Sequence, residues 1–302
     1  MSSFSILVDT NTDLPLDYLD EHKITMIPLA FILNGKMNSG GRWQETSDKE
    51  FYDALRDGGT ASTSLVNQEA FFQFFTECAK KGEALLVVTL SSGLSGTYQN
   101  AVLALDEIKT VYPDCDIHVV DSINAAGGAG LVASFAVDKR KEGFSAAQTA
   151  AFLEDIKHSC LALFTVDDLM YLHRGGRLSK FSAIAGSIIG IKPLLNVAPD
   201  GTLKLKDKVR GRKAALSTLL SQMKRSLNPG TKLTRVIISH SDCLEDGESL
   251  ATMIRNELDA DEIIVTMMGP IIGTHVGPGC VALFFQSDMK REEYEAKFYP
   301  EK

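Results

Sequence analysis

The sequence contains no long apolar run and no concentrated block of positive charge. No stretch of its 302 residues approaches the roughly 18 consecutive apolar residues that a membrane-spanning helix needs. Lysine and arginine are scattered along a chain of formal net charge -8, whereas nucleic-acid binding requires a concentrated positive face. These absences argue against an integral membrane segment and against a nucleic-acid partner.

Paired cysteines and an amino-terminal leader are also lacking. The five cysteines are odd in number and show no paired spacing, which argues against a disulfide framework and against a zinc site. Residues 1–4 lead directly into strand-like sequence, with no basic region and no apolar signal-peptide core. We therefore expect a cytoplasmic protein.

The composition that remains is that of a globular protein long enough for two domains. Hydrophobic residues make up 44% of the chain and charged residues 23%. Residues 1–160 alternate strand-like runs with helical patterns, which predicts an α/β domain with a mostly parallel sheet. Residues 161–302 contain a hairpin-turn signal at Pro199-Asp200-Gly201 and a strand-loop-strand return. We expect a second α/β domain there, with a mixed or antiparallel sheet.

Several local patterns in the first domain predict particular elements. The apolar run 4–8 predicts a buried strand, and the polar residues Asp9 to Asp13 follow it, where α/β folds place ligands. Asp13 also fits the N-cap of a helix that begins near Pro15. Residues 25–33 predict a second strand, and Asn34-Gly35 after it is a strong hairpin signal. At the other end of the chain, the charged residues 288–302 predict a solvated helix.

A stretch rich in glycine and proline, residues 269–279, separates two apolar runs near the end of the chain. Four glycines and two prolines in eleven residues argue against helix and against regular sheet, so we expect a shaped loop between two strands. Thr274 and His275 lie at its centre. We favour a loop that faces a ligand over a plain strand-to-strand turn.

Two further segments, residues 60–64 and 91–97, share this character, because they offer hydroxyl and amide donors and no charged side chain. Such donors suit a single carboxylate or a similar anion. A nucleotide kinase would need a phosphate-loop lysine and carboxylates for magnesium, and these segments hold neither. The chain also has no histidine pair at metal-ligand spacing, so we expect no metal.

A hydrolase is the alternative that these residues leave open. Gly93-Leu94-Ser95-Gly96 approaches the Gly-x-Ser-x-Gly nucleophile motif, although it lacks the second spacer residue. His275 has the chemistry to serve as a base for such a serine. More generally, the rival class is an enzyme, a hydrolase or a phosphotransferase, that acts on a small anionic metabolite.

Motifs over nearly the whole chain resemble those of one family. Residues 9–15 match Asp-Ser/Thr-x-x-Asp-Leu-Pro, and residues 91–98 match Ser-Ser-x-Leu-Ser-Gly-Thr-Tyr. Residues 269–279 match Gly-Pro-x-Ile-Gly-Thr-His-x-Gly-Pro-Gly in full. These patterns resemble the DegV family of bacterial lipid-binding proteins.

Three shorter motifs extend the resemblance, and one segment departs from it. Residues 172–178 look like Leu-x-x-Gly-Gly-Arg-Leu/Ile, residues 191–193 are Ile-Lys-Pro, and residues 211–215 approach Gly-Arg-x-Lys-Ala with the lysine one position early. The family's Thr-Ser-x-Pro-Ser is represented by residues 63–67, which lack the proline near Val66 and end in asparagine. The departure puts the shape of the pocket mouth in question.

The resemblance implies a two-domain α/β protein that holds a long-chain fatty acid in a tunnel between its domains. Family members of known role present the acid to a separate ATP-dependent fatty acid kinase, which makes an acyl phosphate for phospholipid synthesis. The family's carboxylate ligands map onto Thr63 and Ser95, with His275 in the same group. The neighbouring loop residues expected to support them are Ser64, Gly96, Thr97 and Thr274.

The same resemblance implies a carrier and not an enzyme, with no catalytic residue and no cofactor besides the bound fatty acid. The kinase must then dock over the head-group end of the tunnel. The basic residues near family motifs are candidates for that contact: Arg174, Arg177, Arg210 and Arg212.

Overall fold

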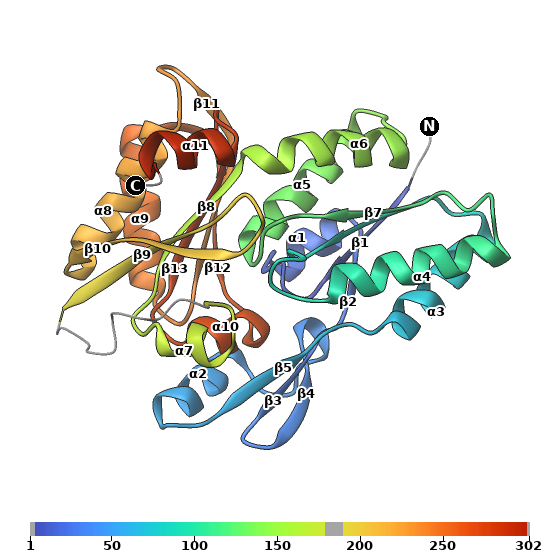
Figure 1. The fold of residues 1–302 in the computed structure, drawn as a ribbon, viewed down its shortest axis with the longest axis horizontal. Coiled ribbons are helices and arrows are strands. Elements are labelled where there is room, and N and C mark those ends of the chain that lie inside the picture. The colour runs from blue at the N-terminus through green and yellow to red at the C-terminus, as the bar shows by residue number, and fades with distance from the viewer. Residues whose placement is uncertain (1–3, 179–189, 301–302) are drawn as a thin grey trace.

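The computed structural model describes residues 4–178 and 190–300, which form two α/β domains (Figure 1). The first domain is built on a sheet in the order β2-β1-β6-β7, and every neighbouring pair of its strands is parallel. This confirms the predicted parallel sheet. The strands are β1 (Ser5–Asp9), β2 (Ile24–Ile27), β6 (Leu85–Thr89) and β7 (Ile117–Asp121).

Helices cover both faces of this sheet, which explains why β6 is buried along its whole length. Leu7 and Val87 pack in one core cluster with residues of α3 and α4, while Val8 and Val88 pack on the opposite face with residues of α5 and α6. The helices of this domain are α1 (Leu16–Glu21), α2 (Asp48–Arg56), α3 (Gln68–Lys81), α4 (Thr97–Val111), α5 (Gly127–Lys141) and α6 (Ala146–Ile156).

The second domain has a mixed sheet in the order β10-β9-β8-β13-β11-β12, as predicted. Only the pair β11 and β12 is parallel among its described strands, and the hairpin of β9 and β10 turns at the predicted Pro199-Asp200-Gly201. The strands are β8 (Cys160–Thr165), β9 (Ile191–Val197), β10 (Leu203–Arg210), β11 (Lys232–His240), β12 (Asp259–Met267) and β13 (Val281–Gln286). The helices are α7 (Met170–Arg174), α8 (Arg212–Arg225), α9 (Leu244–Glu257), α10 (Pro270–Val276) and α11 (Arg291–Phe298).

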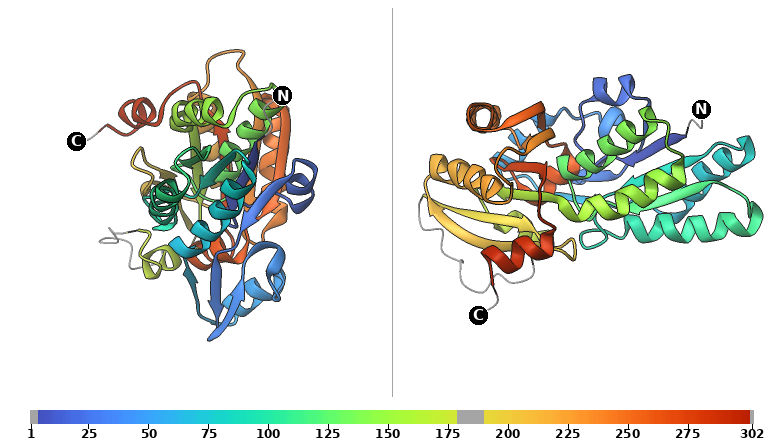
Figure 2. Two further views of the ribbon diagram at one scale, coloured as in Figure 1. Left: turned by 90° about the vertical axis from the view of Figure 1, so that its right-hand side faces the viewer. Right: turned by 90° about the horizontal axis from the view of Figure 1, so that it is seen from above.

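The two domains lie side by side (Figure 2), and α5 packs against both sheets. Helices α8 and α9 cover one face of the second sheet, while Phe164 and Ile237 on its other face share a core cluster with α5. Glycines at the start of α5 allow this close approach. A Cβ on Gly127 would lie 2.5 Å from Cγ2 of Ile237, and one on Gly130 would lie 2.5 Å from the carbonyl oxygen of Thr12. The domains therefore share a core, and the predicted boundary at residues 160 and 161 stays a prediction.

The segment predicted as one strand over residues 25–33 is two strands in different sheets, so that prediction is wrong. Pro28 lies between β2 and β3 (Ala30–Leu33), and proline cannot donate a hydrogen bond to a strand ladder. Strand β3 pairs with β4 (Lys36–Ser39) through the predicted Asn34-Gly35 turn, and on its other side with β5 (Ala61–Ser64). Most of the expected donor loop 60–64 is thus an edge strand.

The stretch expected to be a loop over residues 269–279 contains helix α10, so this prediction is also wrong. Pro270 is the first helical residue, where a missing N–H has no consequence. Gly269 and Gly277 are the N-cap and the C-cap, and Gly277 has a φ of 69° that favours glycine. Only Gly273 lies inside the helix. The residues that break helices thus lie at the ends of this one.

The carboxyl-terminal segment is less solvated than predicted. Helix α11 buries Arg291 and Tyr294, each 1% exposed. The guanidinium of Arg291 donates to the carbonyl oxygens of Ile123 and Cys160, both at 2.6 Å.

Among the helices of residues 4–178 and 190–300, none is long and apolar enough to cross a membrane.

Candidate functional site

A cavity of about 350 Å³ lies where the two domains meet. This volume falls within the range of about 300–1,000 Å³ that is usual for small-molecule sites. The wall is formed mainly by apolar residues of both domains, among them Leu29, Leu90, Phe164, Val197, Ile271 and Phe284. Arg177 is the one charged side chain among the described lining residues. Such a cavity suits a mainly hydrocarbon ligand.

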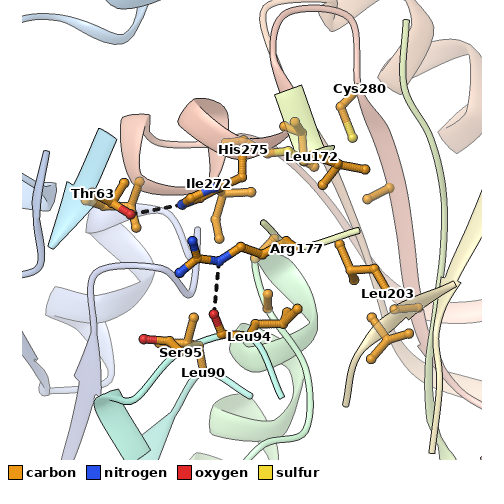
Figure 3. Close-up of a pocket in the computed structure, with 18 of the residues that line it drawn as sticks. Thr63, Leu90, Leu94, Ser95, Leu172, Arg177, Leu203, Ile272, His275 and Cys280 are labelled. Atoms are coloured by element: carbon orange, nitrogen blue, oxygen red, sulfur yellow. Dashed lines mark hydrogen bonds between the residues drawn. The ribbon is translucent and has the colours of Figure 1, made fainter. Parts of the chain in front are cut away.

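The polar groups of the cavity gather at one end, on the left of Figure 3. Thr63 comes from β5 and His275 from α10, which pack against each other although 212 positions separate the two residues. The Oγ1 of Thr63 lies 2.9 Å from Nε2 of His275. The structure therefore brings together two of the three predicted carboxylate ligands.

The imidazole of His275 is held neutral. Burial, with a smaller contribution from the charge of Arg177, lowers its pKa to about 4. Its Nδ1 is buried and has no hydrogen-bond partner in the described part of the chain. A side chain at Gly175 would collide with this nitrogen, so the glycine lets the chain pass close to the ring.

Contacts from the first domain fix the start of α10, the helix that carries His275. Asp13 does not cap α1, whose N-cap is Pro15 and has no side-chain bond. The Oδ1 of Asp13 instead accepts the N–H of Gly269 at 2.9 Å. The hydroxyl of Tyr52 donates to the carbonyl oxygen of Met268 at 2.8 Å. Asp13, from the polar motif after β1, and Tyr52, from α2, thus fix the position of α10 and of His275 on it.

Ser95 approaches the cavity from the loop between β6 and α4. Its Oγ accepts the N–H of Thr97 at 3.2 Å and lies 3.0 Å from the Oγ1 of Thr97. Ser95 and Gly96 line the cavity, while Thr97 is buried behind them. When Thr97 is the donor in this hydroxyl pair, Ser95 keeps its own proton for a ligand.

Arg177 lies between Thr63 and Ser95 in Figure 3, in the wall of the cavity. Its Nε donates to the carbonyl oxygen of Leu94 at 3.1 Å, and its Nη1 donates to that of Gly175 at 2.5 Å. Burial lowers the pKa of its guanidinium. No carboxylate within residues 4–178 and 190–300 forms an ion pair with it. From the sequence, Arg177 is a candidate only for partner docking, because it lies outside the three donor segments.

The other predicted residues have different surroundings. Ser64 lines the cavity, whereas the hydroxyl of Thr274 donates to the carbonyl oxygen of Pro270 at 2.7 Å inside α10. Arg174 and Arg210 are exposed. Arg212 forms ion pairs with Asp246 at 2.9 Å and with Asp167 at 3.5 Å, which gives it a structural role.

The geometry favours binding over hydrolysis. His275 contacts Thr63 and not Ser95, so the serine–histidine pair of the hydrolase alternative is not formed. A pKa of about 4 makes His275 a weak general base at neutral pH, and no carboxylate in the described chain orients its Nδ1. Within residues 4–178 and 190–300, no group of three or more His, Cys, Asp or Glu side chains is placed to hold a metal ion.

Comparison with known proteins relates this chain to one family over nearly its whole length. The family model described as "Uncharacterised protein, DegV family COG1307" matches residues 3–288. A DegV domain-containing protein of Clostridium perfringens is 38% identical over 291 residues, which cover 96% of this chain and 99% of that protein.

Solved structures agree with the fold. A DegV lipid-binding protein of Thermotoga maritima is 30% identical, with a TM-score of 0.84 over 95% of this chain and 99% of that chain. A second protein of Thermotoga maritima, whose structure is described as revealing fatty-acid-binding function, is also 30% identical. Its TM-score is 0.81 over 95% of this chain and 100% of that chain.

Proposed function

Because this chain belongs to the DegV family, we propose that it binds a long-chain fatty acid in the cavity between its domains. The observation that carries the proposal is the division of the cavity into a long apolar wall and one polar end. Burying an acyl chain of around sixteen carbons, at ~0.8 kcal/mol per methylene, supplies on the order of 10 kcal/mol of gross stabilisation. The tail supplies most of the affinity, and the polar end fixes its direction.

The carboxylate is bound by Thr63, Ser95 and Arg177, with His275 behind Thr63. A neutral imidazole that carries its proton on Nε2 donates to the Oγ1 of Thr63, which leaves the hydroxyl proton free for the ligand. Ser95 supplies a second hydroxyl, and Arg177 lacks a counter-charge in the described chain. Hydrogen bonds to a charged acceptor are stronger than neutral ones, so the head group is fixed at this end.

We further propose that the chain is a carrier. The bound carboxylate is presented to a separate ATP-dependent fatty acid kinase, and the resulting acyl phosphate serves phospholipid synthesis in the cytoplasm. The family resemblance supports this role. So does the make-up of the cavity wall, which offers no carboxylate for magnesium among its described residues.

The direct test is to purify the protein, extract it with organic solvent and identify the released lipid by mass spectrometry. We expect about one equivalent of fatty acid, or uptake of one equivalent when the stripped protein is incubated with a mixture of 14- to 20-carbon acids. A stripped protein that takes up none of these acids would refute the proposal.

A further inference from the structure

Leu203 stands between the cavity and a second hollow of the same domain. This hollow is a groove of about 830 Å³ formed by β10, the turn before it and helix α11. Leu203 is the first residue of β10, and its side chain contributes to the wall of the cavity and to the wall of the groove.

Leu203 lies at the apolar end of the cavity. Figure 3 shows it on the side opposite Thr63, His275 and Ser95, with Leu172 and Cys280 nearer to it. Its partner in the strand register is Val197, which also lines the cavity. A fatty acid whose carboxylate lies at the polar end therefore directs its methyl end toward Leu203.

The groove beyond Leu203 offers apolar contacts. Leu205, Ala198, Pro199 and Tyr299 line it, together with the paired charges of Lys206 and Glu295. Leu203 is only partly buried and packs at the edge of the central core cluster. One partly buried side chain thus separates the tail end of the cavity from a larger groove with apolar walls beside it.

We propose, on the basis of the proposed function, that Leu203 sets the acyl chain length by closing the methyl end of the cavity. A smaller residue joins cavity and groove and admits a longer tail, and a larger one shortens the space. Each further methylene taken into apolar contact raises affinity about fourfold, since it contributes ~0.8 kcal/mol.

The test compares Leu203→Ala and Leu203→Phe with Leu205→Ala, measuring competition among saturated 14-, 16-, 18- and 20-carbon acids for the stripped protein. Leu205 is the matched control, because it lies two positions along the same strand and lines the groove but not the cavity. We expect Leu203→Ala to raise the preference for the acid two carbons longer by about fifteenfold. We expect Leu203→Phe to shift preference to shorter acids and Leu205→Ala to match the wild type.

The outcomes separate this inference from the proposed function. If the wild-type protein binds no fatty acid, the proposed function fails. If the wild type binds but neither Leu203 variant changes the order of preference relative to Leu205→Ala, the role of Leu203 is overturned. The phenylalanine variant keeps the test decisive if the alanine variant does not fold, and thermal unfolding of each variant identifies that case.

Discussion

At the scale of single residues, the chemistry of the polar end depends on a histidine that burial keeps uncharged. The Nε2 of His275 has Thr63 as its partner, and its Nδ1 is enclosed beside Gly175. A second proton on the ring would find no acceptor at Nδ1 among the described residues. Burial thus keeps the ring neutral, and a neutral ring with its proton on Nε2 lets Thr63 accept from the imidazole and still donate to a carboxylate.

This state predicts a dependence of stability on pH. The pKa of His275 is about 4 in the folded chain and about 6.5 when unfolded, so the unfolded state binds more protons between these values. The stability that the neutral His275 contributes is fully present above pH 6.5 and is lost as the pH falls toward 4. This loss lowers the free energy of unfolding by about 3 kcal/mol.

The measurement is urea unfolding of the wild type and of His275→Gln at pH 7 and pH 4.5. Glutamine keeps a polar side chain and cannot titrate, so the difference in unfolding free energy between the two proteins should shrink by more than 2 kcal/mol at the lower pH. A difference that stays constant would show that folding does not shift the pKa of His275.

Two hydroxyls are predicted to hold the carboxylate. In Thr63→Ala/Ser95→Ala the head group loses two charge-assisted hydrogen bonds, so fatty-acid affinity should fall by about 3 kcal/mol, or roughly 100-fold. Ser62→Ala/Ser92→Ala removes two exposed hydroxyls from the same strand and loop and serves as the matched control. Titration of the stripped protein with a 16-carbon acid measures the affinity of each double variant. Equal affinities of the two variants would disprove the assignment of Thr63 and Ser95 as carboxylate ligands.

At the scale of elements, helix α10 depends on a glycine that allows it to contact α2. A Cβ on Gly273 would lie 2.5 Å from the hydroxyl of Tyr52 and 2.8 Å from Cε1 of Phe51. Both rings are fully buried, so they have little room to move away from an added methyl group. The glycine costs about 1 kcal/mol in helix propensity, and close packing offsets that loss.

Gly273→Ala is therefore expected to destabilise the protein although alanine favours helix. Overpacking of a core costs about 1–3 kcal/mol, which exceeds the propensity gain of about 1 kcal/mol. Gly247→Ala in α9 is the comparison, because a Cβ there would lie 3.3 Å or more from its neighbours. Chemical denaturation should show a larger loss for Gly273→Ala. A more stable Gly273→Ala would contradict the packing argument.

Which elements the sequence predicts correctly depends on whether the signal is local. Strand β1, the Asn34-Gly35 turn and the turn at Pro199-Asp200-Gly201 are each formed by residues close in sequence, and each was predicted correctly. Helix α10 was missed because Gly273, the one glycine inside it, is explained by contacts with α2, more than 200 positions earlier.

The site shows the same limit. Composition pointed to three donor-rich segments and the family resemblance singled out Thr63, Ser95 and His275 within them, and the structure brings Thr63 and His275 into contact. Arg177 lies in a fourth segment, and only the tertiary structure places it in the cavity wall. A local pattern does not indicate whether an arginine after a glycine pair points into a cavity or into solvent.

At the scale of the whole molecule, hydrogen bonds between the domains lie beside the cavity. The hydroxyl of Ser91 donates to the carbonyl oxygen of Gly201 at 2.9 Å, and Arg177 donates to that of Leu94 at 3.1 Å. Thr63 and Ser95 belong to the first domain, whereas His275, Arg177 and Leu203 belong to the second. A ligand in this cavity contacts both domains, so its binding stabilises their arrangement by mass action.

A carrier of this kind should need its partner for chemistry. Purified protein incubated with ATP, magnesium and labelled oleate should yield no acyl phosphate, and adding the cognate kinase should produce it. The reason is that the cavity wall holds no carboxylate for magnesium among its described residues. Appreciable acyl phosphate from the protein alone would refute the carrier role and support the enzyme alternative.

We expect the exposed arginines to set how fast such a kinase associates with this protein. Arg174 and Arg210 are exposed, whereas Arg212 is engaged in ion pairs and Arg177 in the cavity, so the first two suit a docking role best. Charges at the rim of an interface mainly set the association rate and its salt dependence. Arg174→Glu and Arg210→Glu should therefore slow acyl-phosphate formation several-fold at low salt and leave bound lipid unchanged. Lys80→Glu, on the exposed end of α3, is the control. If all three variants support the wild-type rate at low salt, the kinase docks on another face.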